Sequence, residues 1–274
     1  MENQPEQAAK REQDTKQDPL RETFVEMLFA LAVAQIAIVA EKLAFLDKPL
    51  LEEGPAIAHL FVALILISSS WVGWRRSKSQ GMKEKIESVF GLPYVGLLLD
   101  VFLVILYFIL VQAVEVKQSD PPELTTPSAR PEAKWLLVIF FVYVIWDLIT
   151  DVVPHGAIAN NRSRIRWIFK CLCASIVSTF ASVLSLALIF GVFLLAKRSV
   201  ASVQVICLDV ALVMVIFLFR AAKALEIPLS RWLAVEDCTA FRKHRFVHTG
   251  ERLGGWVCFV GYIALMAAVV FWHY

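Results

Sequence analysis

The stretch that most constrains this chain runs from Leu92 to Val114. It holds 23 residues, and Asp100 is its one charged residue. Because an α-helix rises 1.5 Å per residue, the stretch measures about 35 Å as a helix, enough to cross the roughly 30 Å hydrocarbon core of a bilayer. The sequence therefore predicts a membrane-spanning helix here.

Six further stretches of the same kind predict an all-α, polytopic membrane protein with seven transmembrane helices. Hydrophobic residues make up 58% of the chain, against about 45–50% in soluble domains, and contact with lipid accounts for the excess. Six helices are the alternative, if one of the stretches does not cross. The predicted spans cover residues 24–46, 56–74, 92–114, 135–153, 167–196, 202–219 and 254–272.

The beginning of the chain has a different composition. Residues 1–20 are rich in Gln, Glu, Lys and Asp and have no apolar periodicity. Such a segment buries too little apolar surface to offset the entropy lost on ordering, so we expect a disordered cytoplasmic tail. Residues 21–274 then form a single helical membrane domain with little mass outside the bilayer.

The distribution of basic residues predicts the orientation. With seven spans, 20 of the Lys and Arg residues fall on the amino-terminal side of the membrane and 7 on the other side. Basic residues concentrate in cytoplasmic loops, so the amino terminus is predicted to be cytoplasmic. We expect a multi-pass protein of the cell (inner) membrane.

Several carboxylates and hydroxyls fall inside the predicted spans near their cytoplasmic ends. Charged groups in the hydrocarbon are costly and usually face protein or water, which makes them candidates for function. Asp100 and Asp147 come from adjacent antiparallel spans at similar depth, so they can meet and hold a cation or pass a proton. The alternative is that these carboxylates pair with Arg75, Arg76, Arg162 or Arg220 and fix helix packing. The predicted inner polar site comprises Asp100, Asp147, Asp151 and Ser69.

A second group of polar residues falls nearer the outer side. Asp209 lies in the sixth span, and Gln112 and His59 are its predicted neighbours from the third and second spans. This outer polar site is either the far end of an ion pathway or a hydrogen-bonded lock between helices.

The longest connection between spans, residues 220–252, is basic and contains several aromatic residues. Such a segment lies on an anionic lipid surface or docks a cytoplasmic partner. The residues predicted to make this contact are Arg231, Arg242, Lys243 and Arg245.

No catalytic constellation, phosphate-binding loop or complete metal-ligand set occurs, so the sequence predicts no enzyme, no catalytic residue, no metal site and no cofactor. No nucleic acid partner is expected. Two functions remain open. One is a membrane-embedded subunit, sensor or effector that works with a cytoplasmic protein partner. The other is an ion channel or a proton- or cation-coupled transporter that uses the intramembrane carboxylates. A homo-oligomer is compatible with either function.

Overall fold

The computed structural model of the chain describes residues 19–45, 49–80, 92–114, 116–117, 123–124, 128–149, 164–197, 201–234 and 249–271. Seven helices account for nearly all of these residues. They are α2 (Pro19–Ala44), α3 (Leu50–Gln80), α4 (Leu92–Gln112), α5 (Arg130–Asp147), α7 (Arg164–Ala196), α8 (Ser202–Ala234) and α10 (Thr249–Phe271). Within the described ranges the strands are β1 (Val116–Lys117) and β2 (Glu123–Leu124), which pair antiparallel between α4 and α5.

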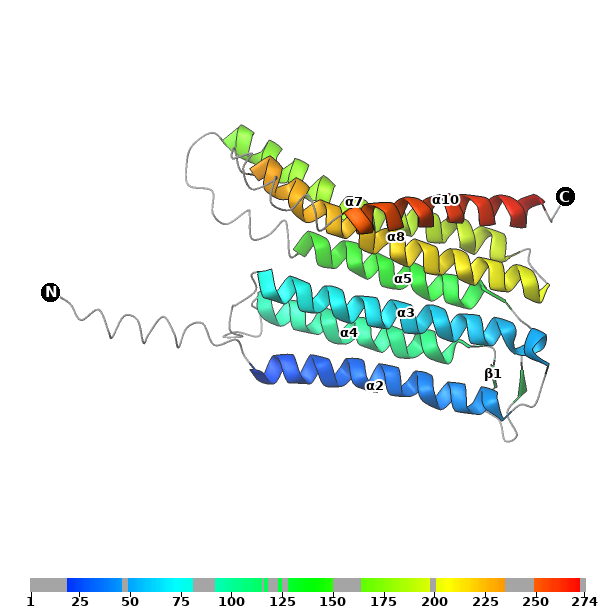
Figure 1. Cartoon of the computed structure of the whole chain (residues 1–274). Coiled ribbons are helices and arrows are strands. Elements are labelled where there is room, and N and C mark those ends of the chain that lie inside the picture. Colours follow the sequence, from blue (N-terminus) through cyan, green and yellow to red (C-terminus); the bar gives the residue numbers. More distant parts are fainter. Residues whose placement is uncertain are drawn as a thin grey trace.

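Successive helices alternate in direction along one common axis (Figure 1). Six of them are long and apolar enough to cross a membrane. The exception is α5, where Arg130, Glu132, Lys134 and Asp147 lower the hydropathy of an 18-residue helix. Even so, α5 packs between α4 and α7 like its neighbours. The chain is a polytopic helical membrane protein, as the apolar stretches predict.

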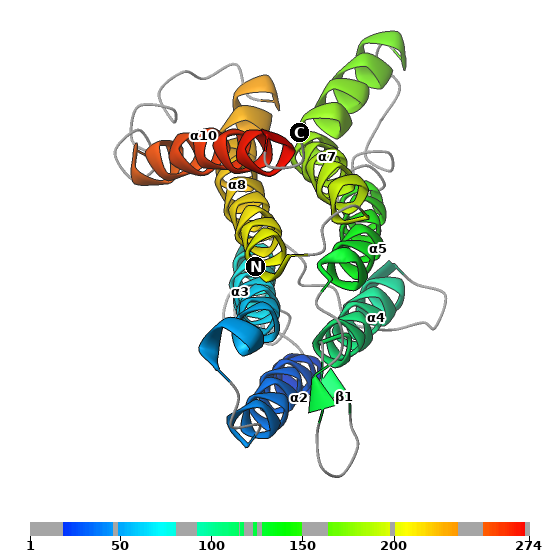
Figure 2. The same cartoon turned by 90° about the vertical axis from the view of Figure 1, so that its right-hand side faces the viewer.

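Viewed along the axis, most of the helices form two rows (Figure 2). One row consists of α3 and α8, and the other of α4, α5 and α7. The rows join at both ends, because α2 contacts α3 and α4, whereas α7 contacts α8. We call the region between the two rows the seam.

Apolar side chains fill most of the seam, and others cover the outside of the bundle. Leu66, Leu110, Leu136 and Leu212 are fully buried, whereas Phe61 on the outer surface is 58% exposed. In a bilayer such outward-facing residues contact lipid tails, so their exposure carries no penalty.

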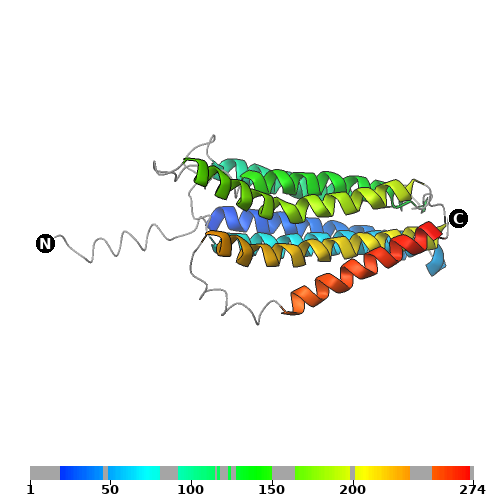
Figure 3. The same cartoon turned by 90° about the horizontal axis from the view of Figure 1, so that it is seen from above.

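The last helix, α10, lies outside the rows and is inclined to the other helices (Figure 3). Small residues let it approach α8 closely. A Cβ atom on Gly255 would lie 2.9 Å from Ala221 Cβ, and one on Gly261 would lie 2.9 Å from Met214 Cε. In addition, the Tyr262 hydroxyl donates a hydrogen bond of 2.8 Å to the Leu188 carbonyl of α7.

Two element boundaries differ from the predicted ones in ways that matter. The fourth helix begins at Arg130 instead of residue 135, with a proline in its first turn, where a missing N–H does no harm. The sixth helix continues to Ala234, so the first half of the predicted 220–252 loop is helical. Of the predicted tail, residues 1–18 lie outside the described residues.

Candidate functional site

Buried polar side chains gather in the seam and form three layers along the bundle axis. We name the layers outer, middle and inner after the predicted orientation. Each layer contains at least one hydrogen bond or ion pair that joins α3 or α8 to the opposite row. The side chains involved are His59, Ser70, Trp74, Asp100, Tyr107, Glu132, Tyr143, Asp147, Ser182 and Lys223.

The outer layer consists of a histidine and a glutamate that are both fully buried. His59 of α3 contacts Glu132 Oε1 of α5 through its Nδ1 atom. Its Nε2 atom lies 2.9 Å from the Leu110 carbonyl oxygen, near the end of α4. One imidazole therefore ties three helices together. We call His59 and Glu132 the dyad.

The middle layer is a cluster of hydroxyls. The Tyr143 hydroxyl of α5 lies 2.5 Å from Ser70 Oγ of α3 and 2.7 Å from the Tyr107 hydroxyl of α4. The Tyr143 ring stacks on Phe219 of α8, with centroids 5.5 Å apart and planes at 2°. This layer thus connects four helices.

The inner layer carries charge. Lys223 Nζ of α8 lies 2.8 Å from Asp147 Oδ1 of α5, and Ser182 of α7 donates to Asp147 Oδ2 at 2.5 Å. A short turn of π-helix follows Asp147, a feature that is frequent at functional sites. On the other side of the layer, Trp74 Nε1 of α3 donates to Asp100 Oδ2 of α4 at 3.2 Å.

Arg220 adds a further cation on the same helix as Lys223. Its guanidinium packs against the backbone of Gly73 in α3, and a Cβ atom at position 73 would lie 2.1 Å from Arg220 Nη1. The guanidinium carbon also lies 5.3 Å from the centroid of the Phe219 ring. Only glycine at position 73 leaves this space for the cation.

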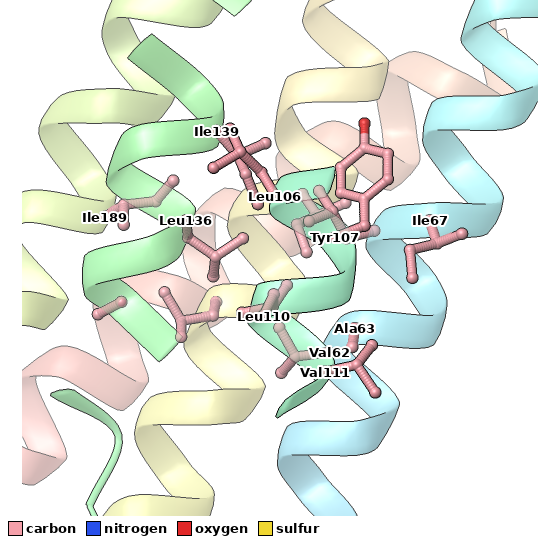
Figure 4. Close-up of a cluster of buried hydrophobic side chains, with 14 of the residues drawn as sticks. Val62, Ala63, Ile67, Leu106, Tyr107, Leu110, Val111, Leu136, Ile139 and Ile189 are labelled. Carbon is pink, nitrogen blue, oxygen red and sulfur yellow. The ribbon is translucent and has the colours of Figure 1, made fainter. Parts of the chain in front are cut away.

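An apolar band lies between the outer layer and the middle layer, and Figure 4 shows some of the buried side chains that form it. His59 and Ser70 are eleven residues apart in α3, as are Glu132 and Tyr143 in α5. At 1.5 Å per residue the gap is about 16 Å. Fully buried side chains such as Ile67, Leu136 and Ile139 fill it. The seam is therefore closed to ions between its outer and middle layers in this conformation.

Comparisons of the chain with protein-family models, curated proteins and solved structures found no match. The site must therefore be interpreted through its own chemistry. Among the described residues, no three His, Cys, Asp or Glu side chains gather closely enough to hold a metal ion. The seam does contain groups that bind and exchange protons: an imidazole, carboxylates and phenols.

The residues of the predicted inner site take different positions. Asp100 and Asp147 are both buried near the inner end of the seam, where Trp74 donates to the first and Ser182 to the second. The counter-ion of Asp147 is Lys223, which was not among the predicted cations. Ser69 donates to the Leu66 carbonyl of its own helix, so it is Ser70 that reaches the seam. Asp151 lies outside the described residues.

The residues of the predicted outer site differ in exposure. The Gln112 side chain is exposed, and both ring nitrogens of His59 face Glu132 and Leu110. Asp209 is buried and contributes to an apolar groove of about 610 Å³ between α3 and α8. The other lining residues are Gly54, Ile57, Ala58, Phe61, Ile206, Val210 and Val213. Arg231 lies on the last turns of α8. Arg242, Lys243 and Arg245 lie outside the described residues.

Sequence reasoning missed the groups that matter most in the seam. Glu132 precedes the predicted fourth span of residues 135–153, yet it is fully buried in the first turn of α5. Tyr107 and Tyr143 look like ordinary apolar residues of a span. Lys223 was assigned to a loop, but it belongs to α8. The sequence did contain a signal for Glu132, which directly follows a proline. Proline is typical of the first turn of a helix, and carboxylates are also favoured there.

Proposed function

We propose that this protein moves a small ion, a proton or another cation, across the membrane along the seam. The observation that carries the proposal is the three-layer arrangement, in which ionisable or hydroxyl groups from facing helices meet at three depths. From His59 to Trp74 the layers extend over fifteen residues of α3, or about 22 Å of a hydrocarbon core of about 30 Å.

Energetics supports a functional role for these groups. Transferring a carboxylate or an ammonium from water to the interior costs several kcal/mol per ion even after relaxation, and the mutual attraction only partly offsets this cost. Apolar residues of similar volume often stabilise a fold equally well or better. A chain that keeps a dyad and a Lys–Asp pair between membrane helices therefore carries groups that folding alone does not require.

The apolar band indicates how transport would work. With the band closed, an ion at the outer layer cannot reach the middle layer. Transport therefore requires the row of α3 and α8 to shift against the row of α4, α5 and α7. Rocking of one helix bundle against another around a central site is the usual route to alternating access. The polar contacts that cross the seam are the ones such a shift would break and remake.

Ion flux into proteoliposomes that contain the purified full chain tests the proposal. The native chain should produce flux well above that of empty liposomes, and the Asp100→Asn, Asp147→Asn double variant should lose most of it. Glu52→Gln is the matched control, because Glu52 is an exposed acidic residue of α3, and it should conduct normally. Native chain that is folded but passes no ion above background would refute the proposal.

A second function is favoured by the length of two helices. With 33 residues each, α7 and α8 measure about 50 Å, roughly 20 Å more than the hydrocarbon core. The start of α7 and the end of α8 lie at the predicted cytoplasmic end and are turned away from α2, α3 and α4 (Figure 1). These ends could hold a cytoplasmic protein, as expected of a sensor or effector subunit.

Photo-crosslinking from position 231 in intact cells tests the second function. A discrete protein adduct that disappears when Arg242, Lys243 and Arg245 are replaced by Ser would support a docked partner. Adducts with lipid alone would contradict it and would leave the basic segment as a membrane-surface element.

A further inference from the structure

The contacts of the outer dyad limit which of its atoms can carry protons. The Leu110 carbonyl oxygen can only accept a hydrogen bond, so His59 Nε2, at 2.9 Å, must carry a proton. His59 Nδ1 faces Glu132 Oε1. Two acceptors would repel each other there, so one proton lies between them, on either the imidazole or the carboxyl group.

The helix ends around the dyad bear on where this proton resides. Glu132 lies in the first turn of α5, where the helix dipole and unpaired N–H groups favour negative charge. Leu110 lies in the last turn of α4, where the dipole favours positive charge. Both dipoles therefore favour an imidazolium paired with a carboxylate. With its proton the dyad is neutral overall, and without it the dyad carries one negative charge in a fully buried position.

We propose that the transported ion is the proton and that the His59–Glu132 dyad is the site that binds it at the outer end of the seam. This inference rests on the proposed function and names the ion that uses the same site. A proton arriving from the outer side joins the deprotonated dyad. The same proton leaves toward the middle layer when the two rows shift, so that each cycle takes up one proton and releases one.

The second carboxylate oxygen of the dyad supports this assignment. Glu132 Oε2 is buried and has no hydrogen-bond partner among the described residues. Leaving a buried acceptor without a partner is unfavourable. Oε2 is therefore a place where a water molecule or another proton donor is favourable. Because Oε1 is engaged by His59, Oε2 is the carboxylate oxygen that remains open to a water molecule bringing a proton.

A metal cation fits the dyad less well than a proton. Hard cations collect six or more oxygen ligands, whereas the described groups here offer the two oxygens of Glu132 and the Leu110 carbonyl. That carbonyl already accepts from His59 and lies 3.1 Å from the Ala113 backbone nitrogen. A proton needs only the lone pairs that are present.

Other ionisable groups at this end of the bundle come from every neighbouring helix. Arg130 stacks over the Phe193 ring of α7 at 5.3 Å, and Lys134 stacks over Trp135 at 5.4 Å, so aromatic rings hold both cations. Asp209 of α8 is a buried carboxylate that lines the same groove as Ala58 of α3. Further ionisable residues at this end are Glu41 and Lys42 of α2, Glu52 and Glu53 of α3, Lys197 after α7 and Cys207 of α8.

The test measures internal pH in proteoliposomes that enclose a pH-sensitive dye, with valinomycin and a potassium gradient to drive proton entry. Separate liposomes in the same preparation report sodium and potassium flux. We expect proton flux in the native chain and at least a tenfold loss in both Glu132→Gln and His59→Gln. Glu132→Asp keeps a carboxylate and should retain part of the flux, and Glu52→Gln should behave like the native chain.

The outcomes separate the two proposals. Flux of sodium or potassium without protons would overturn this inference and leave the proposed function standing. Proton flux that persists in Glu132→Gln and His59→Gln would place the binding site elsewhere. If those variants do not fold, the 15N NMR signals of the His59 imidazole in the native chain provide the test. A His59 ring protonated at Nε2 but sharing no proton at Nδ1 would overturn the inference.

Discussion

Removing Lys223 should destabilise the protein strongly, and removing Asp147 as well should add little to the loss. Lys223 Nζ and Asp147 Oδ1 lie 2.8 Å apart, and the two side chains are 22% and 7% exposed. Lys223→Met keeps most of the side-chain volume but leaves Asp147 buried with Ser182 as its hydrogen-bond donor. Asp147→Asn removes the negative charge and keeps an oxygen for Ser182.

The expected magnitude follows from the geometry. At 2.8 Å and an effective dielectric constant of about 20, the gross attraction is about 6 kcal/mol. Desolvation offsets about half of it, and removing one partner of a buried pair typically costs about 3–5 kcal/mol. We expect about 3 kcal/mol for Lys223→Met, which is somewhat over 100-fold in the unfolding equilibrium. For Asp147→Asn we expect about 2 kcal/mol, because Lys223 is partly exposed and can turn toward water.

The assay is a double-mutant cycle on the free energy of unfolding in mixed micelles of mild detergent and sodium dodecyl sulfate. Because the double variant leaves no unpaired buried charge, it should lose no more than about 3 kcal/mol, which gives a coupling energy of about 2 kcal/mol. Coupling below about 0.5 kcal/mol would mean that the pair is not formed in the folded protein. That result would remove the ion pair from the inner layer.

Three further changes probe other contacts. Tyr262→Phe should cost about 1 kcal/mol, because it removes only the bond to the Leu188 carbonyl, and unfolding in the same micelles checks this. Gly261→Leu should separate α10 from α8, because a Cβ at position 261 would already lie 2.9 Å from Met214 Cε. A disulfide engineered between the two helices should then no longer form. Gly254→Leu is the control, because the space around a Cβ at position 254 is open. Gly73→Ala should displace the Arg220 guanidinium from α3, and faster reaction of Arg220 with phenylglyoxal than in the native chain would report the displacement.

The transmembrane architecture could be predicted well from the sequence because lipid imposes a length and a composition on each helix. The stretch at 92–114 became α4, and the long fifth stretch became a helix of 33 residues. The beginning of α5 could not be predicted in the same way. Its first turn carries Arg130, Glu132 and Lys134, which lower the hydropathy and follow a proline-rich segment. The burial of Glu132 follows from its contact with His59 of α3 and from the packing of α5 against α4 and α7.

Candidate polar residues could be predicted as a class but not as pairs. Asp100 and Asp147 stand out because they interrupt apolar helices, and both are buried. Which group each of them meets depends on helix rotation within a few tens of degrees, and a single sequence does not determine rotation. Ser69 and Ser70 illustrate the difficulty: one residue, or about 100° around α3, separates a hydroxyl bonded to its own helix from one in the seam.

The distribution of contacts within the bundle favours a role for the seam beyond stability. Small residues join α10 to α8, and a neutral hydrogen bond from Tyr262 joins it to α7, so a helix is attached in this protein without an ion pair among the contacts described there. Across the seam, by contrast, the outer layer depends on a histidine and a glutamate, the middle layer on three hydroxyls and the inner layer on an ion pair. Helices packed through apolar side chains can shift against each other with little directional preference. Hydrogen bonds and ion pairs between helices instead favour a few defined relative positions. A boundary built from discrete polar contacts around an apolar band is therefore suited to switch between two arrangements, and that property is what ion transport along the seam requires.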